Sequence, residues 1–475
     1  MSSRARTLWT FAITSAALFM VVLDNLVVTT ALPTIQRSLN ASIQDLEWTV
    51  NAYTLTFAVL LLTGAALGDR FGRRRMFAAG LALFTASSAA AALAPSVDWL
   101  VAARALQGTG GALVLPLTLT ILSDAVPPER RGLALGFWSA ISGLAVAIGP
   151  LVGGAVVEGI SWQWIFWLNV PIGLVVIPLG LTRLRESHGP DRSLDLRGLA
   201  LVSSGLFGVI WALVRGNEVG WTSPQILGAL SGGLLLVAAF VAWELRAPAP
   251  MLPMRFFRRR AFAASNAASL LMYFGMFGSI FLLTQYLQTV HGFSPFKAGL
   301  ATLPWTAMPM FVAPIAGAYA DRIGGRPLMA VGMALQAAAL AWMALITTTD
   351  TPYLQMVIPF AMAGVGMALY FAPSAYVILG SVSRQDEGKA SGAANAIREL
   401  GGVFGVAVLG TIFSRQGGYG APQHFVDGLV PAVAMGAVVV GVGAAMALLI
   451  PGRRAVKAET ETEPVISPVP EVEAA

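Results

Sequence analysis

The chain has 475 residues, of which 56% are hydrophobic and 11% are charged, and its formal net charge is +6. Soluble domains carry about 25% charged residues, so this composition excludes an ordinary water-soluble protein. The chain contains no cysteine, which excludes disulfides, thiolate nucleophiles and cysteine-based metal sites. Because the basic residues fall in short turns between apolar runs, the positive charge indicates membrane loops and no nucleic-acid partner.

Apolar runs of membrane-spanning length follow one another along almost the whole chain. A helix needs about 20 apolar residues to cross a bilayer, and fourteen runs meet this requirement. The first run is longer than the apolar core of a signal peptide, and no small-residue cleavage site follows it, so we predict a permanent span there. We therefore predict an all-α integral membrane protein with spans at residues 8–32, 44–68, 75–94, 98–120, 132–157, 161–183, 196–214, 222–244, 262–290, 297–320, 327–347, 353–380, 390–413 and 428–450.

Lysine and arginine residues are strongly biased to one side of this predicted topology. Alternate loops and both termini hold most of them, whereas the opposite loops hold only Arg37, Arg215, Lys297 and Arg415. By the positive-inside rule, loops rich in these residues face the cytoplasm. The pattern predicts a multi-pass protein of the cell membrane with both termini in the cytoplasm.

Asp24 lies in the middle of the first apolar run, FAITSAALFMVVLDNLVVTTAL at residues 11–32. A carboxylate near the centre of a bilayer costs about 2.5–3.5 kcal/mol on insertion scales, so such residues usually handle ions or substrates. Low dielectric disfavours the charged form of a carboxyl group, which lets it bind and release a proton as its access to water changes. Asp24 is therefore predicted to carry protons in a membrane transporter. The alternative is a structural acid that hydrogen-bonds to a neighbouring helix.

A short motif occurs twice, at the ends of the second and tenth predicted spans. Residues 65–75 read AALGDRFGRRR and residues 317–326 read GAYADRIGGR, so both turns carry Asp, Arg, Gly and Arg in the same order. Two homologous halves of six spans place these turns at equivalent positions if the seventh and eighth spans are an insertion. The predicted domains are a six-helix bundle at 1–190, two inserted spans with a basic cytoplasmic loop at 191–260, a second six-helix bundle at 261–455, and a disordered cytoplasmic tail at 456–475.

Six stretches in a fixed order carry recognisable motifs. They are LDNLVVTTALP at 23–33, the turn at 69–74, LVAARALQGTGGA at 100–112, GLAVAIGPLVGG at 143–154, WQWIFWLNVPIG at 162–173 and NAIRELGGVFGVAVLG at 395–410. Together they resemble the major facilitator superfamily, and within it the fourteen-helix drug:proton antiporters, over roughly residues 8–450. The resemblance implies two six-helix bundles plus two inserted helices. It also implies efflux of drugs or antibiotics driven by the proton motive force.

Three charged residues inside predicted spans are proposed to couple transport to protons: Asp24, Arg104 and Glu399. Arg104 is expected to bias the charge state of Asp24; the alternatives are a side chain that snorkels toward the membrane surface and a fixed tie between two helices. Glu399 lies where the resembled family usually has an uncharged residue and some members have an acid. It is predicted to be a second proton or cation site, the alternative being a structural partner of an arginine. Because neighbouring residues on a helix do not face each other, Glu399 is not expected to pair with Arg398.

Two groups of residues are predicted to control the switch between conformations. In the turn motifs, a carboxylate can cap a helix across the bundle while arginines bind acids or lipid phosphates; the alternative is a turn that only sets the topology. In the fifth span, glycines and a proline allow close packing and a bend, which serves either tight closure or packing alone. The predicted gating residues are Asp69, Arg70, Gly72, Arg73, Arg74, Asp321, Arg322, Gly143, Gly149, Pro150, Gly153 and Gly154.

Aromatic and polar side chains in four of the spans are candidates for substrate contacts. Aromatic side chains suit varied hydrophobic compounds, and their ring faces hold organic cations. Such residues are more often lipid-facing or part of the core, which is the alternative at each position. The predicted substrate-binding residues are Asn51, Tyr53, Trp138, Tyr273, Phe277 and Arg398.

Motifs of ATPases, serine hydrolases and zinc peptidases are absent from the sequence, and His188, His291 and His424 lie in separate loops. No enzyme activity, metal or cofactor is therefore expected. We predict a proton-coupled antiporter, a monomer among membrane lipids, that exports hydrophobic drugs or antibiotics, cationic ones among them. The alternatives are a dedicated exporter of one endogenous metabolite, antibiotic or lipid, and a non-transporting membrane sensor or scaffold.

Overall fold

The structure is a computed structural model that describes residues 3–41, 43–127, 130–189, 195–248, 250–383, 386–418 and 421–452. Within these ranges the regular structure is entirely helical. The helices are α1 (Ser3–Leu39), α2 (Ile43–Phe71), α3 (Arg73–Ala92), α4 (Val97–Ala125), α5 (Arg131–Gly159), α6 (Trp164–Trp167), α7 (Asn169–Arg183), α8 (Leu196–Val219), α9 (Pro224–Glu244), α10 (Arg255–Arg258), α11 (Arg260–Thr289), α12 (Pro295–Thr306), α13 (Met308–Ile323), α14 (Gly325–Ile346), α15 (Tyr353–Gly380), α16 (Glu387–Gln416) and α17 (Pro422–Leu448).

Fourteen of the described helical segments are long and apolar enough to cross a membrane, as the sequence predicts. The pair α6 and α7 makes one of these segments, and the pair α12 and α13 makes another. The break between α12 and α13 falls between Pro304 and Pro309, and proline removes a backbone donor and crowds the preceding turn. The predicted boundaries at residues 190 and 260 stay a prediction, and the predicted tail at 456–475 lies outside the described residues.

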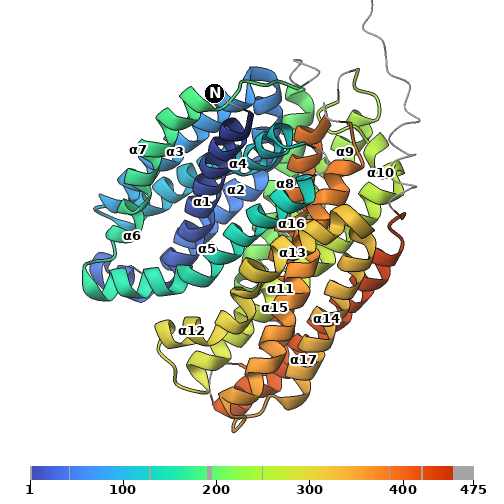
Figure 1. The fold of residues 1–475 in the computed structure, drawn as a ribbon. Coiled ribbons are helices and arrows are strands. Elements are labelled where there is room, and N and C mark those ends of the chain that lie inside the picture. The colour runs from blue at the N-terminus through green and yellow to red at the C-terminus, as the bar shows by residue number, and fades with distance from the viewer. Residues whose placement is uncertain are drawn as a thin grey trace, which may run out of the picture.

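The first and last groups of helices form two halves that lie side by side (Figure 1). In the first half α4 packs against α2 and α3, and α1 packs against α5. In the second half α11 packs against α16 and α17, and α14 packs against α15 and α17. One large apolar cluster is formed mainly by α1–α8 and continues into α15 and α16 of the second half, and the other is formed by α11–α17.

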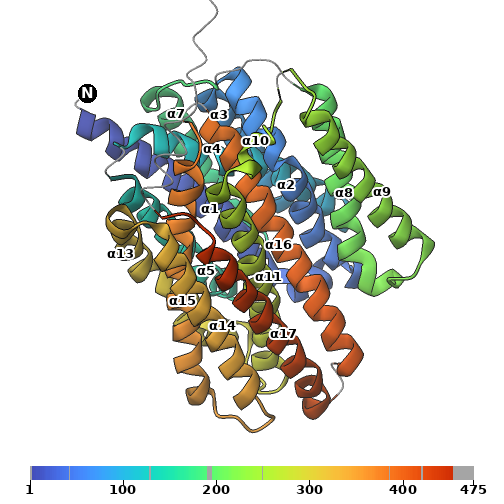
Figure 2. The ribbon, with the colours of Figure 1, turned by 90° about the vertical axis from the view of Figure 1, so that its right-hand side faces the viewer.

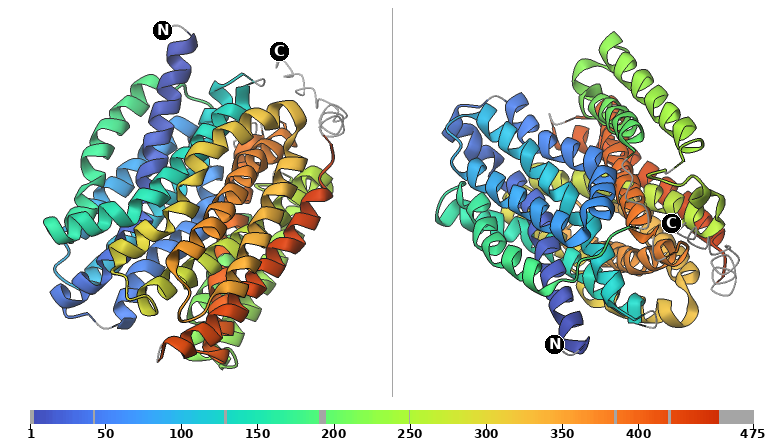
Figure 3. Two further views of the ribbon diagram at one scale, coloured as in Figure 1. Left: turned by 60° about the horizontal axis from the view of Figure 1, so that its bottom comes forward. Right: turned by 90° about the horizontal axis from the view of Figure 1, so that it is seen from above.

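The helices α8 and α9 pair with each other at the edge of the molecule (Figures 2 and 3). Helix α8 also packs against α2 of the first half and α16 of the second. The hydroxyls of Thr63 and Ser203 are 3.3 Å apart, and the indole N–H of Trp221 donates to the hydroxyl of Thr411 at 3.1 Å. The hairpin therefore contacts both halves.

One end of the bundle holds the arginine-rich turns, and we call it the basic side. Helices α1 and α11 begin there, and α2 ends there. The arginines at 73–75 follow the end of α2, and those at 258–260 lie at the start of α11. The halves approach very closely on this side, where α5 crosses α13. A Cβ atom added to Gly132 would lie 2.4 Å from the carbonyl oxygen of Gly317, so only glycine permits this crossing.

Candidate functional site

Asp24 lies in α1 with its side chain buried inside the first half. Its Oδ2 accepts a hydrogen bond from Nη1 of Arg104 at 2.5 Å. Its Oδ1 accepts from Nε2 of Gln107 at 2.8 Å and from Nδ2 of Asn169 at 2.7 Å. Both carboxylate oxygens are thus satisfied by donors from α4 and α7, and the carboxylate is fixed by three different side chains.

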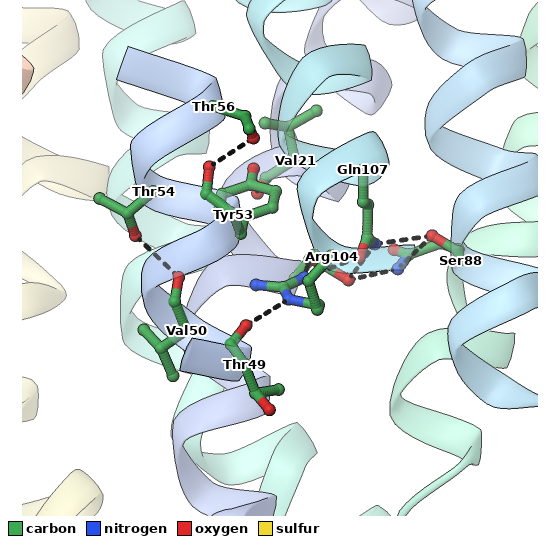
Figure 4. A network of polar contacts seen from close by, with 11 residues as sticks. Val21, Thr49, Val50, Tyr53, Thr54, Thr56, Ser88, Arg104 and Gln107 are labelled. Atoms are coloured by element: carbon green, nitrogen blue, oxygen red, sulfur yellow. Dashed lines mark hydrogen bonds and ion pairs between the residues drawn. The ribbon is translucent and has the colours of Figure 1, made fainter. Parts of the chain in front are cut away.

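Arg104 is completely buried on α4 and contacts several groups at once. Besides Asp24, its Nη1 donates to Oε1 of Gln107 at 2.7 Å, and its Nε donates to the carbonyl of Thr49 at 3.2 Å. The guanidinium lies over the ring of Tyr53, 4.3 Å from the ring centroid. Figure 4 shows Arg104 extending between Tyr53 and Thr49 on one side and Gln107 on the other. Its Nη2 has no hydrogen-bond partner within the described part of the chain.

Ser88 of α3 completes this polar network. Its hydroxyl oxygen accepts from Gln107 at 2.7 Å and from Asn169 at 3.3 Å, and Figure 4 shows Ser88 beside Gln107. Residues of α1, α3, α4 and α7 therefore meet around Asp24. Arg104 is seven residues from the start of α4, which places it about 10 Å from the end of the helix opposite the basic side. The network therefore lies inside the membrane-spanning part of the bundle, nearer the side opposite the basic turns.

The electrostatics of this network are those of a buried ion pair. Removing two charges from water costs several kcal/mol per ion, and only good geometry with extra hydrogen bonds offsets that cost. Breaking such a pair by removing one partner typically costs about 3–5 kcal/mol, because the other charge stays buried. Any event that neutralises Asp24 thus changes the packing energy of α1 against α4 and α7.

Gln107, Asn169 and Ser88 belong to the network but were not among the residues predicted from the sequence. Gln107 stands three residues after Arg104, a spacing that puts both side chains on one face of a helix. Asn169 is the single amide in the run WIFWLNVPIG. Uncharged polar residues inside membrane spans are the signal that points to them.

The predicted residues Arg398 and Glu399 lie on α16 in the second half. Arg398 is buried, donates from Nη2 to the hydroxyl of Ser374 at 3.2 Å, and lies 5.9 Å from the ring centroid of Tyr273. Glu399 is only partly buried. Among the described residues no ion pair joins Arg398 to Glu399, and no hydrogen bond joins Glu399 to Asp24.

Tyr273 is the centre of an aromatic cluster in the second half. It stacks on Phe371 of α15 with ring centroids 5.4 Å apart, and it lies 5.6 Å from the ring of Phe277 one turn further along α11. Phe277 is exposed. The structure thus brings Tyr273, Phe277 and Arg398 together.

The other three residues predicted to bind substrate lie in the first half. Tyr53 is buried between Arg104 and Phe57, and its hydroxyl approaches the carbonyl of Val21 at 3.5 Å. Trp138 is buried on α5, and Asn51 is partly exposed on α2. Tyr53 therefore belongs to the network of Asp24 rather than to the group around Tyr273.

The first turn motif, between α2 and α3, lies against the start of α16. Asp69 pairs with Arg73 at 2.9 Å, and a Cβ added to Gly388 would lie 2.5 Å from its Oδ1, so the carboxylate faces the N-terminus of α16. Gly72 has a φ of 105°, a conformation that favours glycine and lets the chain turn between the two helices.

The two remaining arginines predicted in this motif contact neighbours within the first half. Arg74 contacts Glu186 through its backbone N–H at 2.9 Å and through its side chain at 3.6 Å. The guanidinium of Arg70 lies 5.1 Å from the ring centroid of Phe71. Asp69 and Arg73 are therefore the members of this motif at the boundary between the halves.

The second turn motif, at the end of α13, lies against the start of α5. Asp321 accepts hydrogen bonds from the backbone N–H groups of Gly132 at 3.1 Å and Leu133 at 3.3 Å. Arg131 donates to Glu387 of α16 at 2.8 Å, also between the halves. Arg322, which follows Asp321, is exposed. In each motif, the carboxylate lies at the N-terminus of a helix from the other half, where a negative charge is stabilising.

The predicted glycines of α5 place this helix close to both halves. A Cβ on Gly149 would lie 2.8 Å from the side chain of Leu26 in α1, and one on Gly143 would lie 2.6 Å from Pro309 in α13. One on Gly154 would lie 3.1 Å from Phe296 in α12. Gly153 is buried, and Pro150 also lies within α5. Substitution at these glycines would push α5 away from its neighbours.

Comparisons with known proteins agree on one family. A model of the Major Facilitator Superfamily matches residues 14–406 and 265–470. The chain is 36% identical over 433 residues to the tetracenomycin C resistance and export protein of Streptomyces glaucescens, covering 90% of this chain and 80% of that protein. It is 35% identical over 409 residues to the multidrug resistance protein Stp of Mycobacterium tuberculosis, covering 86% and 76%. It is 37% identical over 426 residues to the cephamycin export protein CmcT of Amycolatopsis lactamdurans, covering 87% of each.

Solved structures share the fold at low sequence identity. The human organic anion transporter MFSD10 superposes with a TM-score of 0.67 at 14% identity, over 93% of this chain and 99% of that chain. The proton:xylose symporter XylE superposes with a TM-score of 0.68 at 15% identity, over 95% and 97%. Together with the fourteen membrane-length helices of the described chain, these likenesses confirm the predicted fold class, an all-α major facilitator fold.

Proposed function

The chain belongs to the major facilitator superfamily, and on this premise we propose that it exports hydrophobic, drug-like compounds from the cell in exchange for protons. Relatives that share over a third of their residues with it, along most of their length, are named as resistance and export proteins. The aromatic cluster of Tyr273, Phe277 and Phe371 supports a hydrophobic substrate, because flat rings and their faces suit such compounds.

The observation that carries the proton coupling is the buried ion pair of Asp24 and Arg104. The carboxylate is held by donors from two other helices inside a membrane-spanning bundle. When a proton binds Asp24, the attraction to Arg104 falls and the packing of α1 against α4 and α7 weakens. The alternative is a purely structural ion pair. Its geometry and hydrogen bonds would have to offset the same burial cost although the pair takes no part in transport.

The orientation of the chain in the membrane follows from the basic side. By the positive-inside rule this side faces the cytoplasm, and the chain then lies in the cell membrane with both termini inside. The halves contact each other there through Asp321, Arg131 and Glu387, so we assign this conformation to a transporter closed toward the cytoplasm. In the proposed cycle, Asp24 is charged when substrate binds from the cytoplasm, and external protons neutralise it as substrate leaves.

The driving force is sufficient for useful export. One proton moving inward through a membrane potential of 100 mV releases about 2.3 kcal/mol. Since 1.36 kcal/mol corresponds to a factor of ten, one proton per cycle supports a gradient of roughly 50-fold for an uncharged compound. A monomer with a single proton site can therefore power efflux.

A second candidate is a dedicated exporter of one endogenous compound. Several relatives are named for a single antibiotic, including tetracenomycin C, actinorhodin and cephamycin, which favours this candidate. The two candidates share the mechanism and differ in the range of substrates.

An accumulation assay in whole cells tests the proposal directly. Cells that express the chain should accumulate less ethidium than cells with an empty vector, and a protonophore should remove the difference. A panel of unrelated hydrophobic antibiotics separates the candidates, since reduced accumulation of many compounds indicates multidrug export. Efflux that continues after the protonophore collapses the proton gradient would contradict proton coupling.

The Glu399→Gln variant should lose transport of cations more than transport of neutral compounds. Glu399 is partly exposed and lies close enough to Tyr273 to interact with it electrostatically, and a carboxylate there attracts cationic ligands. We expect several-fold slower efflux of ethidium and little change for the neutral dye Nile red, whereas Glu399→Asp should behave like the wild type. An equal loss for both dyes in Glu399→Gln would contradict a cation-binding role.

A further inference from the structure

A hollow of about 620 Å³ opens on the basic side, between the start of α1 and the end of α7. It is lined by Arg6, Thr182, Arg183, Leu184 and Arg185. All of these side chains except Leu184 are exposed. Arg6 precedes Asp24 by 18 residues on α1, a rise of about 27 Å, so the hollow is far from the network around Asp24.

The hollow is strongly positive. Three of its five lining residues are arginines. No ion pair of the described residues involves Arg6 or Arg185. The acid nearest in sequence, Glu186, lies 3.6 Å from Arg74 and 3.7 Å from Arg75 and also accepts the backbone N–H of Arg74. The charge of Glu186 is thus already balanced by other arginines.

The hydroxyl of Thr182 donates to the carbonyl of Pro178 at 2.7 Å. Its proton is engaged within α7, so the guanidinium groups of Arg6 and Arg185 are donors that the hollow offers to a ligand. Guanidinium groups bind phosphate with two parallel N–H donors, a geometry that the compact ammonium of lysine lacks. The chemistry of the hollow therefore suits a phosphate group.

The surface beside the hollow is apolar. On α1, Leu8 is 68% exposed, and on α7, Leu174 and Leu181 are 65% and 44% exposed. Trp9 is also exposed, and the guanidinium of Arg183 lies 5.4 Å from its ring centroid. Tryptophan is typical of the interface between membrane and water. A ligand that fits both the positive hollow and this apolar surface has an anionic head and a hydrocarbon tail.

We propose that this hollow binds the phosphate head of an anionic phospholipid, whose acyl chains lie along α1 and α7. The lipid would join the ends of two helices that carry Asp24 and Asn169 further along. It would thereby stabilise the packing of α1 against α7, and a membrane poor in anionic lipid would weaken it. This site is separate from the proposed proton and substrate sites and does not depend on them.

The test measures lipid binding to the purified full-length protein by native mass spectrometry in a neutral detergent. The probes are dioleoyl-phosphatidylglycerol, dioleoyl-phosphatidylcholine and glycerol 3-phosphate. The variant Arg6→Gln/Arg183→Gln/Arg185→Gln removes the hollow's charge. The matched control, Arg246→Gln/Arg258→Gln/Arg326→Gln, removes the same charge from other exposed positions on the same side. Thermal unfolding of each variant verifies that it is folded.

The wild type and the control should prefer phosphatidylglycerol to phosphatidylcholine. The hollow variant should bind phosphatidylglycerol on the order of 100-fold more weakly, because each arginine near an anionic lipid raises the binding constant roughly fivefold. Equal losses in the variant and the control would overturn the proposal, since the effect would then be general charge. Competition by glycerol 3-phosphate as strong as that of the lipid would also overturn it, in favour of a site for small anions.

Discussion

The Asp24→Asn variant is expected to lose proton-driven efflux completely. Asparagine keeps the shape of the side chain but can neither bind a proton nor pair with the charge of Arg104. The measurement is the initial rate of ethidium transport driven by a pH gradient, compared at equal amounts of protein in the membrane. Asp24→Glu, which keeps a titratable carboxyl group, should retain part of the rate.

A simple failure to fold has to be separated from this loss. Asp24→Asn leaves Arg104 as a buried charge without its partner, which costs about 3–5 kcal/mol of stability. The double variant Asp24→Asn/Arg104→Gln removes both charges and should recover most of the thermal stability. It should still fail to transport, because the proton site remains absent. Transport by this stable double variant would show that the ion pair is only structural.

The second large effect is expected at the contact between the halves, where Arg131 of α5 meets Glu387 of α16 at 2.8 Å. Arg131→Glu places two acids opposite each other and should disfavour the conformation closed on the basic side. The interaction energy between two contacting residues of this kind is about 0.5–3 kcal/mol. We therefore expect the transport rate to fall by roughly tenfold or more. The rate of ethidium efflux at saturating substrate is the measurement.

The charge-swapped variant Arg131→Glu/Glu387→Arg provides the control. It restores an ion pair of opposite orientation and should recover a large part of the rate. Recovery should be incomplete, because an arginine at the N-terminus of α16 is unfavourable beside the helix dipole and near Arg73. If the double variant is no faster than Arg131→Glu alone, the contact does not act through its charges.

The sequence predicts the number of membrane helices well because the bilayer imposes a length on every apolar run. All fourteen predicted spans correspond to membrane-length helices of the described chain. The break between α12 and α13 was not predicted, since the hydropathy of a proline-containing run does not reveal where its helix is interrupted. The short helices α6 and α10 are likewise too small to produce a hydropathy signal.

The candidate site was predictable in part. A charge inside an apolar run is conspicuous, so Asp24 and Arg104 were identified, and the structure places them in contact. Gln107, Asn169 and Ser88 were missed because their importance depends on which helices meet, and that is decided by tertiary packing. The role of Tyr53 in binding substrate stays a prediction, and the structure places its ring against the guanidinium of Arg104.

The most direct test of proton antiport uses inverted membrane vesicles that contain the wild-type protein, without ATP. An acid lumen is imposed and ethidium is added outside, so that protons leaving the lumen can drive the dye inward. If transport is proton antiport, ethidium accumulates until the pH gradient is collapsed, and its entry causes a matching alkalinisation of the lumen. Ethidium accumulation of equal size with and without the pH gradient would contradict proton antiport.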